Sequence, residues 1–96
     1  MAVQHMVWMK FHEGVSADRI ERHMKNLAAM TEKIDVVADL HVGPSFTDRA
    51  GGYTHGLLVT VADRAALKTY LEHPEHVAVA KPLKADAEIV AMDIES

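Results

Sequence analysis

The 96-residue sequence predicts an α+β fold in which strands and helices follow the order β-α-β-β-α-β. Three observations support this prediction. The segments 2–11 and 53–61 alternate in the manner of strands, whereas apolar residues over 17–34 recur at helical spacing. Glycine and proline residues separate the segments. One core is the norm at this length, so we expect a single domain over 1–96.

The first half of the chain is predicted to form a strand, a helix and a second strand. Residues 2–11 carry apolar side chains on both faces, so this strand should be covered on both sides. Ser16 is a good N-cap for a helix over 17–34, which has one apolar stripe and charged residues elsewhere. A short strand over 37–42 is followed by a turn-rich loop over 43–52.

The second half is predicted to repeat the pattern of strand and helix. A strongly alternating strand over 53–61 leads into a helix over 64–72, which a His-Pro pair interrupts. A further helical piece over 75–81 should end or kink at Pro82. The last strand covers 87–94. This order is that of the ferredoxin-like split βαβ sandwich.

Composition and charge exclude several classes of function. The net charge is −4 with neutral histidines, and the ten Lys and Arg residues form no basic patch, so we expect no nucleic-acid partner. No apolar stretch approaches membrane-spanning length, and the N-terminus has no positive leader, so we expect neither a membrane partner nor a signal peptide. The lack of cysteine excludes disulfides and thiolate catalysis, which fits a reducing, cytoplasmic location.

One face of the predicted sheet is apolar without a helix to cover it. Two helices cover one face of such a sheet, and the opposite face would carry Met6, Trp8, Leu58, Val90 and Met92, or else the residues that point to the other side of the same strands. An apolar surface of this kind needs a partner. We therefore expect a homodimer whose two sheets pack face to face.

Two strand positions break the apolar pattern, His5 in the first strand and His55 in the third. We expect these strands to be parallel neighbours, which would place both histidines at the same end with backbones about 5 Å apart. The helical segment that follows would return Tyr70, His73 and His76 to the level of His55. These groups then converge on one pocket if the helices cover the histidine face.

Two other interpretations of these histidines compete with a functional pocket. A strand histidine is more often a satisfied core residue than a catalyst, so packing alone is one alternative. A three-His metal site is the other, with His73 and His76 joined by His5 or His55. No carboxylate second shell supports such a site, and we predict no metal. The remaining histidines should be solvated or lie at an edge, without a role: His12, His23 and His41.

Three segments of the chain are similar to those of a known family. They are the position of His5 near the start, the strand entry Gly52-Tyr53-Thr54-His55, and Tyr70-Leu71-Glu72-His73-Pro74-Glu75-His76-Val77, which is the most specific of the three. On these segments the chain resembles the stress-responsive dimeric α/β-barrel (Dabb) family, and the resemblance covers residues 2–95. The resemblance implies a ferredoxin-like homodimer. Members of the family include bacterial proteins without an assigned activity, plant stress proteins and a polyketide cyclase that performs an aldol closure without a metal or organic cofactor.

The resemblance places the functional groups of the cyclase on His5, His55, Tyr70 and His76, with His76 as the base and no cofactor. An imidazole near neutral pH can deprotonate a carbon flanked by carbonyls. A tyrosine hydroxyl can hydrogen-bond the resulting enolate oxygen. We expect His5, His55 and His73 to bind the polar end of a small, partly apolar carbonyl ligand. Two further functions stay open, a non-enzymatic stress or assembly protein and a cofactor-independent monooxygenase.

Overall fold

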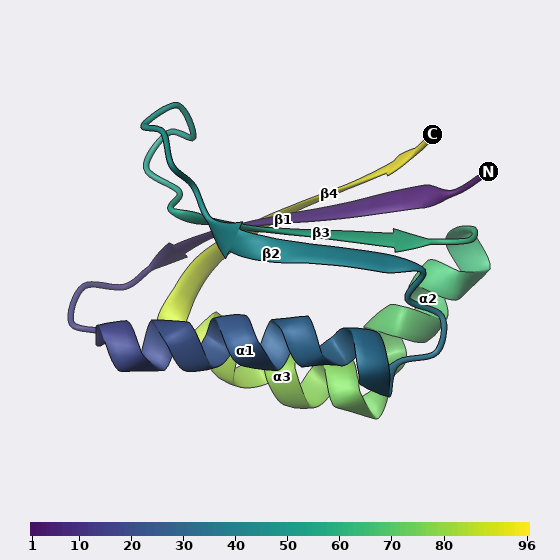
Figure 1. Ribbon diagram of the computed structural model, residues 1–96, viewed down its shortest axis with the longest axis horizontal. Coiled ribbons are helices and arrows are strands. Elements are labelled where there is room, and N and C mark those ends of the chain that lie inside the picture. Colours follow the sequence, from purple (N-terminus) through teal and green to yellow (C-terminus); the bar gives the residue numbers. More distant parts are fainter.

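The computed structural model describes residues 1–96 as two layers, a four-stranded sheet and three helices that cover one of its faces (Figure 1). The elements are β1 (Val3–Phe11), α1 (Ala17–Lys33), β2 (Asp39–Pro44), β3 (His55–Val61), α2 (Arg64–Glu72), α3 (Pro74–Asp86) and β4 (Ala87–Glu95). The strand order is β2-β3-β1-β4, and all neighbouring pairs are antiparallel. The predicted ferredoxin-like α+β fold is therefore confirmed. None of the helices combines the length and apolarity needed to cross a membrane.

The third helix is longer than predicted. α3 begins at Pro74 and continues through Pro82 to Asp86, so the predicted helix end at residue 81 is wrong. A proline inside a helix removes one amide hydrogen bond. Leu83 and Asp86, which follow it, are both buried, and this packing offsets the lost bond. The other predicted elements lie within two residues of the observed ones.

The directions of β1 and β3 correct the predicted arrangement of the histidines. These strands are neighbours but antiparallel, so the predicted parallel pairing is wrong. The crossover through α1 makes β2 parallel to β1, and the β2–β3 connection then inserts β3 between them in the reverse direction. His5 lies opposite Val59, whereas His55 lies opposite Met9. The two histidines are therefore four residues, or about 13 Å, apart along the sheet.

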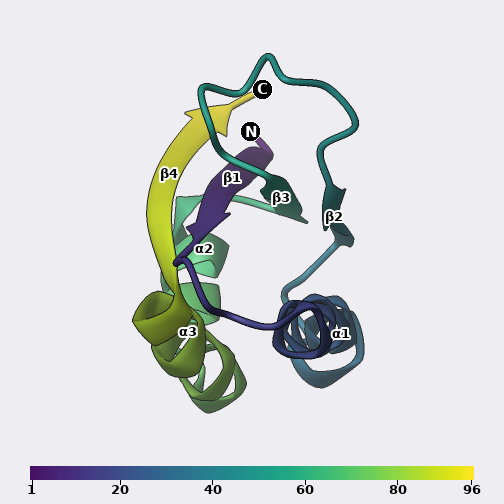
Figure 2. The same ribbon diagram turned by 90° about the vertical axis from the view of Figure 1, so that its left-hand side faces the viewer.

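The core lies between the sheet and the helices, which Figure 2 shows beneath β1 and β3. Thirteen buried apolar residues form it. Alternate residues of β1 from Val3 to Met9 point into this core, and His5 is one of them. The parity predicted for His5 is therefore correct.

The face of the sheet away from the helices is apolar, as predicted. Met6 lies opposite Leu58 on β3 and Met92 on β4, and Trp8 lies opposite Val90, so all five share this face. Four of the five are exposed: Trp8, Leu58, Val90 and Met92. We call this surface the open face. The loop between β2 and β3 rises on the same side of the sheet (Figure 1).

Candidate functional site

His5, Tyr70 and His76 lie together where β1, α2 and α3 meet. The rings of His5 and Tyr70 meet edge to face with centroids 5.6 Å apart, and the rings of Tyr70 and His76 are 4.7 Å apart. His5 points inward from β1, Tyr70 is the buried residue of α2, and His76 lies in the first turn of α3. Three of the predicted site residues are thus brought together.

These three rings border an apolar cavity of about 150 Å³. Its walls come from β1, β3, β4 and all three helices, and most of them are aliphatic side chains. Only His5, Tyr70, His76 and Lys84 bring polar side-chain groups to the lining. An apolar cavity of this size can hold a molecule about as large as benzene.

His5 is held by a carboxylate that sequence reasoning missed. Asp93 lies directly opposite His5 on β4, and its Oδ1 is 2.5 Å from Nδ1 of His5. A carboxylate partner keeps the proton on Nδ1 and orients the ring, which leaves Nε2 available. The signal was present in the sequence, because Asp93 is an acidic residue that shares its strand face with the apolar Ile89 and Ala91. Only the antiparallel register places it beside His5.

His76 has the properties of a neutral base. Its Nδ1 donates a hydrogen bond to the carbonyl oxygen of Leu71 at 3.0 Å, so Nε2 carries the free lone pair of the neutral ring. Burial lowers the pKa of His76, and electrostatic repulsion between its charged form and His5, Lys84 and His73 acts in the same direction, against the Leu71 hydrogen bond. The ring is therefore unprotonated at neutral pH.

Tyr70 is fully buried, and its hydroxyl has a weak partner. The hydroxyl donates to Sδ of Met30 at 3.9 Å, and a thioether sulfur is a poor acceptor. Burial raises the pKa of Tyr70 far above its ordinary value, so the phenol remains protonated. Tyr70 can act as a hydrogen-bond donor in this site and not as a base.

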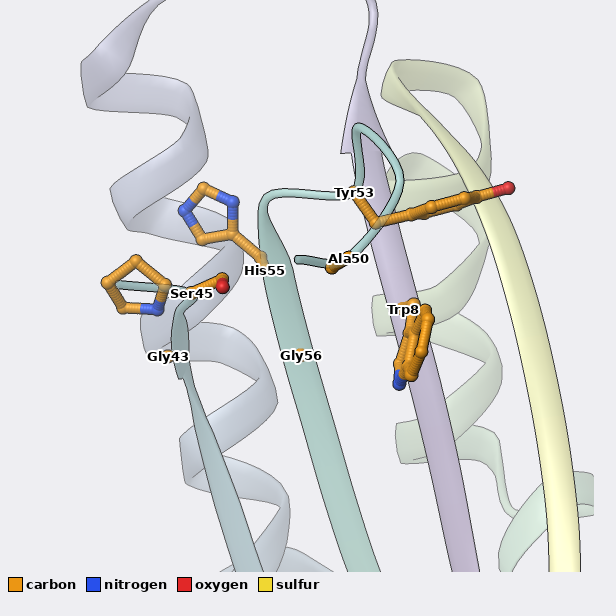
Figure 3. Close-up of a pocket in the computed structure, with 8 residues that line it drawn as sticks. Trp8, Gly43, Ser45, Ala50, Tyr53, His55 and Gly56 are labelled. Atoms are coloured by element: carbon orange, nitrogen blue, oxygen red, sulfur yellow. The ribbon is translucent and has the colours of Figure 1, made fainter. Parts of the chain in front are cut away.

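His55 does not reach this cavity. Its ring packs edge to face on Phe11, with centroids 5.2 Å apart, and burial lowers its pKa. It borders a different hollow of about 280 Å³ at the start of β3. Figure 3 shows its ring directed away from Trp8 and Tyr53, which lie on the other side of that hollow.

His73 also lies outside the cavity, where it caps a helix. Its Nδ1 accepts a hydrogen bond from the backbone N–H of Glu75 at 3.1 Å, which makes it the N-cap of α3. The structure contains no group of three or more His, Cys, Asp or Glu side chains that could hold a metal ion.

The prediction that His23 is solvated or lies at an edge is wrong. His23 is buried, with Nε2 2.7 Å from Oδ2 of Asp86, and Arg19 donates to Oδ1 of the same carboxylate at 2.5 Å. The hydrogen bond from His23 and the charge of Arg19 hold the pKa of Asp86 below its usual value. These two interactions with Asp86 join α1 to the end of α3. His23 precedes Leu27 by four residues, which already placed it on the inward helix face.

The comparisons with known proteins agree with this fold. A family model for the stress responsive A/B barrel domain matches residues 3–96. The stress-response A/B barrel domain-containing protein HS1 of Arabidopsis thaliana is 32% identical over 77 residues, which are 78% of this chain and 71% of HS1. Olivetolic acid cyclase of Cannabis sativa is 29% identical over 79 residues, 80% of this chain and 78% of the cyclase.

A solved structure extends the agreement to three dimensions. The crystal structure of a dimeric ferredoxin-like protein from Jannaschia sp. CCS1 has a TM-score of 0.86 and 26% identity, and the match covers 100% of both chains. The family model spans nearly the whole chain, and the segments that carried the resemblance include His5, Tyr70 and His76, three of the residues that line the cavity. The chain therefore belongs to the stress-responsive A/B barrel (Dabb) domain family.

Proposed function

We propose that the protein is a homodimer that binds a small, partly apolar carbonyl compound beside His76 and catalyses cofactor-free chemistry of the lyase or cyclase type. The observation that carries this proposal is the state of His76. Its Nδ1 proton is fixed by the carbonyl of Leu71, its pKa is lowered by burial, and it borders an apolar cavity. A neutral imidazole in such a place is a suitable general base.

The proposed reaction starts with a proton transfer. Nε2 of His76 removes a proton from the carbon next to a carbonyl group, and the electron pair moves to the carbonyl oxygen to form an enolate. The hydroxyl of Tyr70 donates to this oxygen, since its present acceptor is only a thioether. The enolate carbon then attacks a second carbonyl carbon of the same molecule, and the imidazolium returns its proton to the new alkoxide. The name of one relative, olivetolic acid cyclase, states a cyclase activity, which supports this reaction class.

His5 and Asp93 form the second polar element of the proposed site. The carboxylate of Asp93 orients the ring of His5, which contacts Tyr70, so that Nε2 of His5 can accept a hydrogen bond from a hydroxyl group at the polar end of the ligand. Asp93 is thus a positioning residue. His55 and His73 have no part in this proposal, because neither lines the cavity.

The homodimer is proposed because the open face has no cover within the chain. Trp8, Val90 and Met92 are exposed side by side on a sheet whose other face carries the helices. An apolar surface of this kind is typical of a protein–protein interface. The related protein from Jannaschia, which has the same fold, is dimeric.

A non-enzymatic stress or assembly protein is the second candidate, and one observation favours it. The hydroxyl of Tyr70 is directed at Met30 rather than at a histidine, and Tyr70 is 0% exposed. If the three rings only pack, His76 is a satisfied structural residue. Its removal would then leave the Leu71 carbonyl unpaired and cost about 1–3 kcal/mol of stability.

Proton exchange on a simple ketone distinguishes the enzymatic proposal from the non-enzymatic one. The methyl protons of acetophenone, followed by NMR in D₂O, should exchange faster with the wild-type protein, and His76→Ala should abolish the acceleration. Tyr70→Phe should reduce it. The wild-type rate should fall as pH drops through the pKa of His76, which lies below its ordinary value, because protonation removes the base.

The matched control and the stability of the variants separate the two candidates. His12→Ala removes an exposed histidine just after β1 that does not line the cavity, and it should not change the exchange rate. His76→Ala should lower the free energy of unfolding by about 1 kcal/mol or less. A larger loss of stability, without any acceleration by the wild-type protein, would refute the enzymatic proposal and favour the packing role.

A further inference from the structure

Lys84 is the cationic side chain at the rim of the cavity. It follows His76 by eight residues on α3, and His76, Ala80 and Lys84 all line the cavity at four-residue spacing. Residues at this spacing share one helix face. Eight residues of helix correspond to about 12 Å, so the cavity runs along α3 from the base to the ammonium group. Lys84 is exposed and takes part in none of the ion pairs of the structure.

The two ends of the cavity differ in charge. Lys84 lies at one end, and at the opposite end the carboxylate of Asp93 binds His5 beside Tyr70. Lys84 lies three residues before β4 begins, whereas Asp93 lies near the end of that strand. An anionic ligand group would be repelled at the His5 end and attracted at the Lys84 end. Between them the walls are aliphatic, so the body of the ligand must be apolar.

We infer that Lys84 selects ligands that carry a carboxylate opposite the reacting carbonyl group, with one ring or a chain of similar size between the two. This inference rests on the proposed function, since it takes the carbonyl to lie beside His76. The cavity volume of about 150 Å³ limits the apolar body to about one ring. The exposed ammonium lets the carboxylate stay at the rim, where it remains hydrated.

The effect of Lys84 on His76 supports their proximity. The positive charge of Lys84 is one of the causes that lower the pKa of His76. Lysine side chains in a helix lean toward its N-terminus, and here that direction leads from residue 84 toward His76. A carboxylate bound to Lys84 is therefore part of the same site and not of a separate surface.

A pair of probes that differ only in charge tests the inference. 4-Acetylbenzoate and 4-acetylbenzamide have the same ring and the same methyl ketone, and only the first carries a carboxylate. At neutral pH the wild-type protein should bind the acid about fivefold more tightly than the amide, as expected for a partly exposed ion pair. Lys84→Gln should bring the ratio of the two affinities close to one. Lys84→Arg should keep most of the preference, because the charge remains.

Lys81→Gln is the matched control, because Lys81 is exposed on the same helix but does not line the cavity. It changes the net charge as Lys84→Gln does and should leave the affinity ratio unchanged. Equal affinity of the wild-type protein for both probes would overturn the inference. An affinity ratio that Lys84→Gln leaves unchanged would overturn it as well. The same holds if neither probe binds the wild-type protein at millimolar concentration.

Exchange of the acetyl methyl protons distinguishes this inference from the proposed function. Binding of the acid that depends on Lys84, without faster exchange, upholds the ligand class and refutes the role of His76 as a base. Faster exchange that needs His76, with no preference for the acid, upholds the base and overturns the role of Lys84.

Discussion

Replacing Trp8 by alanine should weaken the proposed homodimer strongly. Trp8 is 49% exposed in the single chain. A tryptophan buries about 150–250 Å² when covered, so the exposed half offers about 75–120 Å² to a partner. At about 25 cal/mol per Å² this amounts to about 2–3 kcal/mol per protomer. A symmetric dimer contains the residue twice, which gives about 4–6 kcal/mol and raises the dissociation constant about a thousandfold or more if the partner covers both rings.

Sedimentation velocity over a dilution series measures this effect. The 10.6 kDa chain should sediment at about twice its mass when wild type, and Trp8→Ala should sediment as a monomer at micromolar concentration. Val77→Ala is the control, because Val77 is also 49% exposed but lies on the outer side of α3. A wild-type monomer, or a Trp8→Ala dimer with an unchanged dissociation constant, would refute the assignment of the open face as the interface.

Two further predictions concern the ion pair of Asp86 and the absence of a metal. Because His23 and Arg19 hold the folded-state pKa of Asp86 below its unfolded value, this carboxylate stabilises the fold above the unfolded pKa, and the contribution is lost as pH falls through the folded one. Asp86→Asn should therefore lower the melting temperature at neutral pH and flatten its decline in acid, whereas Asp48→Asn in the exposed loop should do neither. Dialysis of the wild-type protein against a chelator should leave the melting temperature and the affinity for 4-acetylbenzoate unchanged, and stoichiometric zinc in the purified protein would contradict this expectation.

Local periodicity was enough to predict most of the elements and which residues of a strand share a face. The strand period of two placed His5 on the same face as Val7 and on the opposite face from Trp8, which is correct, but it left open which face the helices cover. The direction of a strand is not encoded in its own pattern. It follows from the connections, and the assumption that β1 and β3 are parallel moved His55 to the wrong end of the sheet.

The missed residues depend on contacts between elements distant in sequence. Asp93 contacts His5 only in the observed β1–β4 register, and the two are 88 residues apart along the chain. His23 is buried because the end of α3 brings Asp86 to it across 63 residues. Neither pairing leaves a local signature beyond a polar residue on an inward face. Tyr70 and His76 were found because they are close in sequence within a recognisable segment.

One polar pair of the site, together with a second pair on the other face of β1, also determines the register of β1 in the sheet. Both faces of β1 are apolar, so hydrophobicity alone distinguishes poorly between its register and a slip by one residue. The cross-strand pairs His5–Asp93 and Gln4–Thr60, with atoms 2.5 Å and 2.7 Å apart, form only in the observed register. His5 therefore has a structural role in addition to its proposed one, and its removal disturbs the sheet as well as the ligand. His76 makes one hydrogen bond, to a backbone carbonyl at the edge of the cavity, so His76→Ala is the variant that separates chemistry from folding.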